Sequence, residues 1–158
     1  MKHDGGLILS TLGLGAIAGV RSMAAPAALS RAVERGDIGN LEDTPLAALG
    51  SSGVSTALRL LKIGEMFVDK LPLAPSRTSP PPLLGWAASG AFVGSALFVS
   101  AGRRAAAGGA LGAASAVVGA YLGERLRLMG VERLGVPDPA VALLEDGVVL
   151  FGATRLLR

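Results

Sequence analysis

The 158-residue chain has no cysteine, and it is poor in histidine, aromatic residues and charge. Without cysteine there is no disulfide, thiolate metal site or thiol nucleophile. His3 is the only histidine and stands near one end, which disfavours imidazole catalysis and histidine metal sites. We therefore predict no catalytic site and no cofactor. An enzyme that uses Glu65 and Asp69 inside a membrane stays open as an alternative, although no residue pattern suggests a substrate.

Charged residues make up 17% of the chain, where about a quarter is usual for a soluble domain. Apolar residues make up 51%, and the mean hydropathy is +0.54. The net charge is +3, but the basic residues stand singly or in pairs and form no stripe. We therefore expect a lipid bilayer as the surroundings of the protein and no nucleic-acid partner.

Two uncharged stretches of nineteen residues, Leu83–Ala101 and Ala105–Gly123, are the clearest membrane signals. At ~1.5 Å per residue each would reach ~28 Å, close to the hydrocarbon thickness of a bilayer. Arg103 and Arg104 stand between them. This pattern predicts two transmembrane helices joined by a short polar turn.

The first apolar segment, residues 5–30, is interrupted by one charge and one proline. Pro26 predicts a kink or a break in a helix there. Lys2 followed by an apolar run also resembles a signal peptide, but Arg21 stands where a cleavage region would be uncharged. We expect this segment to be the first membrane helix.

Two further segments combine apolar and charged residues. Residues 139–157 are apolar apart from Glu145 and Asp146 near the middle, with one arginine at the end. Residues 45–71 begin apolar and then become charged, so they either span the membrane or line a cavity. The fold predicted is all-α, a polytopic transmembrane bundle of four or five helices in a single domain of residues 1–158. Its expected location is the cell (cytoplasmic, inner) membrane, crossed several times.

Four pairs of glycines are spaced four residues apart, so each pair lies on one face of a helix. They are Gly15 and Gly19, Gly90 and Gly94, Gly108 and Gly112, and Gly119 and Gly123. Small residues at this spacing let helix backbones approach closely in lipid. We predict tight helix packing at these faces.

Charged residues within 45–71 form one helical stripe. They are Arg59, Lys62, Glu65 and Asp69. At this spacing they fall within an arc of about 120°, so the helix is amphipathic. Glu65 and Asp69 have the spacing to offer oxygens to a hard cation such as Mg²⁺ or Na⁺. The alternative is ion pairing, of Glu65 with Lys62 and of Asp69 with Lys70 or Arg77.

A weak internal repeat adds a prediction about architecture. Residues 12–36 and 111–135 both run from a Gly/Ala-rich helix to a "VERG" or "VERLG" end, and a helix with central acids follows each. With five spans, residues 5–71 and 105–157 would form inverted halves linked by helix 83–101. Chance similarity between Gly/Ala-rich helices is the alternative.

The basic residues give no preferred orientation. With five spans, six lysines and arginines fall on each side of the membrane, so the positive-inside rule has nothing to act on. With five spans, insertion in both orientations and a homodimer of antiparallel copies are compatible with this balance; if residues 45–71 do not span, the balance no longer holds.

Four segments together resemble domain-of-unknown-function family 4126, small and mostly bacterial integral-membrane proteins. The segments are "GAIAGVRSMAAPAALS", "GEMFVDKLPLAPSRTSPPPLLG", "GAASAVVGAYLGERLR" and "VALLEDGVV". The resemblance covers nearly the whole chain and implies a membrane location but no activity. Its pattern marks Glu65, Asp69, Lys70, Pro72 and Arg77, together with Arg21, Glu145 and Asp146.

The resulting hypothesis is a transporter or channel for a small ion or small solute with a polar core. The candidate binding residues supplying negative charge are Glu65, Asp69, Glu145 and Asp146, and those balancing or gating it are Arg21, Arg77 and Lys70. The alternative is a structural or lipid-interacting scaffold whose charges only form ion pairs. A soluble partner at the proline-rich residues 72–82 is a third alternative.

Overall fold

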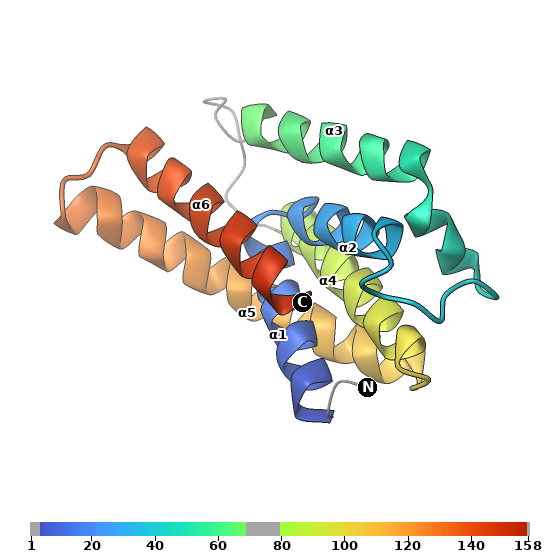
Figure 1. The fold of residues 1–158 in the computed structure, drawn as a ribbon. Helices are drawn as coiled ribbons and strands as arrows, with labels where there is room; N and C mark the ends of the chain where they lie inside the picture. Colours follow the sequence, from blue (N-terminus) through green and yellow to red (C-terminus); the bar gives the residue numbers. More distant parts are fainter. Residues whose placement is uncertain (1–3, 69–79, 158) are drawn as a thin grey trace.

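The computed structural model describes residues 4–68 and 80–157 of the chain, with side chains described to Glu65 in the first range. Within these ranges all regular structure is helical and no strand occurs, which confirms the all-α prediction (Figure 1). The elements are α1 (Asp4–Val20), α2 (Ala24–Glu34), the 3₁₀ helix η1 (Pro45–Gly50), α3 (Ser52–Val68), α4 (Pro80–Ser100), α5 (Ala105–Leu128), the π-helical turn η2 (Met129–Arg133) and α6 (Asp138–Leu156).

Helices α4 and α5 form the antiparallel hairpin that the sequence predicts. The turn between them contains Gly102 with a φ of 68°, a left-handed conformation that glycine adopts at little cost. The backbone N–H of Arg103 closes the turn on the carbonyl of Phe98 at 2.7 Å. Helix α5 continues five residues past the predicted end at Gly123, through Glu124 and the arginines and leucines that follow. Those residue types are all good helix formers.

Glycine faces bring three helices into backbone contact, as predicted. A Cβ atom at Gly90 or Gly94 of α4 would collide with the carbonyl oxygens of Gly112 or Gly108 of α5. A Cβ at Gly15 of α1 would stand 2.7 Å from the Gly112 carbonyl oxygen. Helix α1 therefore lies in the crossing of α4 and α5, and its buried Leu14 joins their Val93 in the core.

The segment 5–30 breaks into two helices, but not at the proline. Helix α1 ends at Val20 and α2 begins at Ala24, so the break covers residues 21–23. Pro26 is the third residue of α2, where its missing N–H removes no intrahelical hydrogen bond. The prediction of an interruption is correct, and its expected position at Pro26 is wrong by a few residues.

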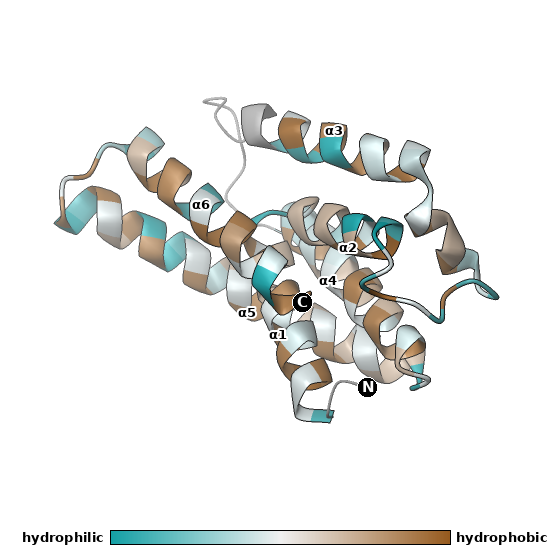
Figure 2. Cartoon of the chain, in the orientation of Figure 1, coloured by the Kyte–Doolittle hydropathy of each residue, from teal (hydrophilic) through white to brown (hydrophobic). Residues whose placement is uncertain are grey.

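Residues 45–68 form η1 and α3, and α3 turns its polar side inward. The buried Ser55 hydroxyl donates to Glu34 of α2 at 2.7 Å, and Arg59 lies 4.0 Å from the same carboxylate. The exposed residues include the apolar Leu60 and Leu61, at 64% and 57%. Figure 2 shows the mixed hydropathy of α3, which lies across α2 and away from the α4–α5 hairpin.

Two of the described helices have the length and apolar composition to cross a membrane. They are α4 and the continuous α5–η2 helix, Ala105–Arg133. Helix α1 is apolar but only 17 residues long, or ~25 Å. Among the described residues the structure thus supports two candidate spans, fewer than the four or five predicted.

Helix α6 returns along α1 and closes the bundle (Figure 1). The hydroxyl of Ser10 on α1 donates to the carbonyl of Leu156 at 2.7 Å, and Leu157 is buried in the core. At the opposite end of α6, Asp138 holds Arg127 of α5 through two hydrogen bonds of 2.7 Å. These contacts set the middle of α6 beside the α1–α2 break.

Candidate functional site

The α1–α2 junction, residues 21–23, is where polar side chains from four parts of the chain converge. Three helices that are distant in sequence reach it. They contribute Glu65 from α3, Ser89 from α4 and Asp146 from α6. The junction is therefore the polar centre of an otherwise apolar molecule.

Arg21 and Asp146 form a buried ion pair. Nε of Arg21 lies 2.9 Å from Oδ1 of Asp146, and the two side chains are 3% and 10% exposed. Moving both charges out of water costs several kcal/mol per ion, and only close pairing with further hydrogen bonds offsets it. Position 146 is in the middle of α6, so no helix end helps to stabilise the carboxylate.

Oδ2 of Asp146 is buried and has no hydrogen-bond partner within the described parts of the chain. An acceptor left in that condition loses about 1–3 kcal/mol of hydration. Native proteins rarely leave such atoms unsatisfied, and those that occur often belong to sites that hold water or a ligand. The ion pair is thus made with one oxygen, and the other remains available.

Glu65 caps the N-terminus of α2 from a different helix. Its Oε1 accepts hydrogen bonds from the N–H and the hydroxyl of Ser22, both at 2.7 Å, and Oε2 accepts from the N–H of Met23 at 2.9 Å. Met23, at the N-cap position, makes no side-chain cap of its own. A carboxylate satisfies the free N–H groups of a helix start and suits its positive dipole. The hydroxyl of Ser89 binds the Ser22 carbonyl from the α4 side.

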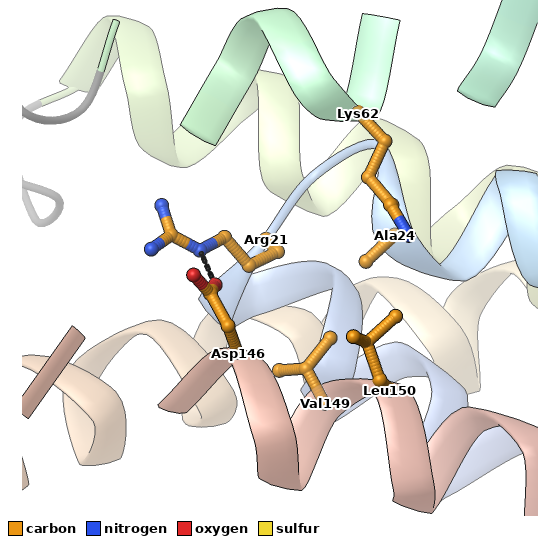
Figure 3. Close-up of a pocket in the computed structure, with 6 residues that line it drawn as sticks. All are labelled: Arg21, Ala24, Lys62, Asp146, Val149 and Leu150. Carbon is orange, nitrogen blue, oxygen red and sulfur yellow. Dashed lines mark hydrogen bonds and ion pairs between the residues drawn. The ribbon is translucent and has the colours of Figure 1, made fainter. Parts of the chain in front are cut away.

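A small recess lies beside the ion pair, between α3 and α6 (Figure 3). Its lining residues are Arg21, Ala24, Lys62, Asp146, Val149 and Leu150. The recess has a volume of about 10 Å³, room for about one water molecule. Lys62 descends into it from α3, and no hydrogen bond or ion pair joins its ammonium group to another described residue.

The structure brings together only part of the predicted site. Arg21, Glu65 and Asp146 meet at the junction. Glu145 is half-buried on α6, engages in an interaction of its own, and does not line the recess. The remaining predicted residues, Asp69, Lys70 and Arg77, lie outside the described residues, as does 72–79 of the proline-rich segment.

The hydrogen-bond partners of Glu65 differ from both partners that the sequence suggests. The sequence suggests either a cation or Lys62 as the partner, whereas the structure pairs Glu65 with Ser22 and Met23. All three contacts come from N–H or O–H donors, which a cation would have to displace. The described residues contain no group of three or more acidic or histidine side chains placed to hold a metal ion.

Ser22 and Ser89 are the site residues that sequence reasoning misses. Serine is common throughout the chain, so residue type alone does not single out these two serines as site residues. One local cue existed, because Ser22 directly follows Arg21 at the end of an apolar run. Serines favour helix starts, where their side chains compete for free backbone groups.

The two segments of the weak repeat share one feature and differ in another. Each ends in a glycine with positive φ, 77° at Gly36 and 64° at Gly135. The break at 21–23 has no counterpart at residues 120–122, where α5 is continuous. The inverted relation of the two halves stays a prediction.

No protein-family model, curated protein or solved structure matches the chain. The resemblance to family 4126 therefore stays a prediction.

Proposed function

We propose that this chain is an integral membrane protein that passes a small ion or small solute at the α1–α2 junction. The single observation that carries the proposal is the buried Arg21–Asp146 pair at a helix break, with one carboxylate oxygen left unpartnered among described residues. Ionisable groups inside membrane helices are expensive, and they commonly mark ion or substrate pathways. Broken helices that meet in mid-membrane form the binding sites of many transporters.

The membrane location is supported by large apolar side chains on the outside of the molecule. Large apolar residues are exposed along α5 and α6, whereas Arg21 and Asp146 are buried. The exposed set includes Val118, Leu122, Leu126, Leu143, Leu144, Val148 and Phe151. A monomeric soluble protein rarely exposes so continuous an apolar surface. Lipid satisfies it without any further partner.

The topology proposed extends the two candidate spans to four, or to five if the region around α3 also crosses. Helix α1 packs against both α4 and α5, and α6 packs against α1, so all four would share one bilayer. Helix α3 is too polar on one side to face lipid all round, but its polar side meets α2 and its exposed Leu60 and Leu61 face outward. The same proposal includes three further points. They are membership of family 4126, a location in a bacterial inner membrane, and a homodimer of oppositely oriented copies. Tagging each end of the chain and asking which compartment sees it tests the orientation.

Reconstitution in liposomes tests the proposed transport. Radiotracer or pH-dye flux is measured for wild type, for Glu65→Gln and for Asp146→Asn, with Glu145→Gln as the neighbouring acid. Glu132→Gln is the matched control, because Glu132 is exposed in η2, away from the junction. We expect flux to fall at least tenfold in Asp146→Asn and to stay unchanged in the control. Unchanged flux in all the junction variants would overturn the proposal.

A second candidate function is a membrane scaffold without transport. The observation that favours it is that Glu65 already has three protein partners and that Arg21 already has Asp146. A clasp of this kind would predict that the variants lose stability in detergent and that wild type shows no flux above empty liposomes. The liposome experiment therefore separates the two functions.

A further inference from the structure

The recess at the ion pair contains an acceptor but little else that could hold a ligand. Oδ2 of Asp146 is a buried atom without a hydrogen-bond partner in the parts of the chain described, and the side chain that carries it is 10% exposed. The other described lining residues are the apolar Ala24, Val149 and Leu150 and the cationic Arg21 and Lys62. Whatever occupies the recess must bind to one carboxylate oxygen.

A metal cation fits this lining badly. Hard cations take six or more oxygen ligands, or keep several waters. Among the described residues the recess offers one free protein oxygen, and it has room for about one water molecule. Two of its lining groups, Arg21 and Lys62, are cationic and repel a second positive ion. Helices α5 and η2 contribute no charged group to the described lining.

A proton needs only the acceptor that is present. Resting on the proposed function, we propose that Asp146 Oδ2 is a proton-binding site served by one water in the recess, and that the cargo is the proton and not a metal ion. On uptake an O–H bond forms at Oδ2 as the water gives up its proton, and that water regains a proton from the adjoining solvent. On release the same bond breaks, the proton passes to the water in the recess and from it to the solvent, and the carboxylate re-forms, while Oδ1 stays with Arg21.

Lys62 acts as the selectivity residue of this site. Its ammonium lines the recess without a partner among the described residues, so its charge is directed at whatever enters. It stands on α3 and does not take part in the Arg21–Asp146 pair. Replacing it removes a positive charge from the recess and leaves the ion pair in place.

The experiment measures proton and sodium movement separately in liposomes containing the full chain. A potassium gradient with valinomycin drives proton entry, which a trapped pH dye reports, and radioactive sodium uptake is followed in parallel. We expect wild type to acidify the lumen equally in sodium and choline media and to take up no sodium. Asp146→Asn should lose at least tenfold of the proton flux, and Asp146→Glu should keep part of it.

Lys62 variants test selectivity while the ion pair stays in place. Lys62→Met should admit sodium at several times the background, and Lys62→Arg should not. The control for both fluxes is Glu132→Gln, at an exposed position in η2, which should match wild type. The infrared difference spectrum of wild type minus Asp146→Asn at low pH should contain one carboxylic acid band, and this band should be shifted when Asp146→Glu replaces wild type. This band does not depend on transport.

The outcomes separate this inference from the function on which it rests. Sodium uptake without proton entry, or proton entry that requires sodium, would leave ion transport standing and overturn the proton site. Proton entry that is unchanged in Asp146→Asn would also overturn the proton site. No movement of any ion in wild type would overturn transport itself.

Discussion

The α4–α5 contact and the α1–α2 junction use opposite means to hold helices together. At the first, Gly90 and Gly94 meet Gly108 and Gly112, backbone against backbone, without a charge. At the second, the helices are held by an ion pair and by hydrogen bonds to a carboxylate. The glycine contact depends on the absence of side chains, and the junction depends on a few particular ones. Substitutions should therefore act through crowding at one and through lost partners at the other.

The largest effect is expected from removing the acid of the buried pair. Asp146→Leu removes the carboxylate that faces Arg21 and leaves the guanidinium, whose side chain is 3% exposed, without that contact. Breaking a buried pair in this way costs about 3–5 kcal/mol. Thermal unfolding in detergent should report the loss as a clearly lower melting temperature.

The matched control is the double variant Arg21→Met with Asp146→Leu. Removing both charges should restore much of the stability, because neither is then buried alone. If the double variant is as unstable as the sum of the two single variants, the pair is not the reason for the loss.

A smaller effect is expected at the glycine contact. In Gly94→Ala the new methyl group meets the carbonyl of Gly108, so the helices must separate. Overpacking of this kind costs about 1–3 kcal/mol. Gly85→Ala on the same helix is the control, since nothing lies within 4 Å of a Cβ there. Equal melting temperatures for the two variants would contradict the close contact.

Glu65 should show an intermediate loss that belongs to capping. Glu65→Ala removes the acceptor of the Ser22 and Met23 N–H groups, and loss of a helix cap costs about 0.5–2 kcal/mol. Glu42→Gln, at an exposed position, is the control. Hydrogen exchange at the start of α2 should accelerate in Glu65→Ala only. Unchanged protection there would argue against the cap.

The smallest effect is expected at the exposed clasp between α5 and α6. Arg127 and Asp138 share two hydrogen bonds, but the Asp138 side chain is 52% exposed. Exposed pairs contribute about 0–1 kcal/mol. Arg127→Gln should therefore lower the melting temperature far less than Asp146→Leu does. A loss as large as that of the buried pair would show that burial is not what separates them.

The glycine contact could be anticipated from sequence because its signals are local. Uncharged length predicts α4 and α5, and the four-residue spacing places each glycine pair on one face. The end of α5 was less predictable, because Glu124 and the arginines after it suit both a helix and a membrane border. Helix propensity favours the helix there, and Arg127 in this extension binds Asp138 at the start of α6.

The junction could not be assembled from sequence in the same way. Arg21 and Asp146 are 125 residues apart, and Ser22 and Glu65 are 43 apart. Spacing within a helix says which side chains share a face, but not which distant helix meets that face. The type of residue was informative all the same, because a charge in an apolar run must find a partner. For Arg21, Glu65 and Asp146 the sequence indicated that each charge requires a polar partner. Only the fold shows which residue that partner is.

That separation of 125 residues has a consequence for how the protein is made. A ribosome completes Arg21 long before it reaches Asp146, so the nascent chain carries this arginine through most of its synthesis without the α6 carboxylate. If α1 enters a bilayer as proposed, its insertion has to tolerate the charge near one end until the last helix is made. Chains released before α6 is made would retain Arg21 without the Asp146 carboxylate. This feature would mark them as unfinished for degradation.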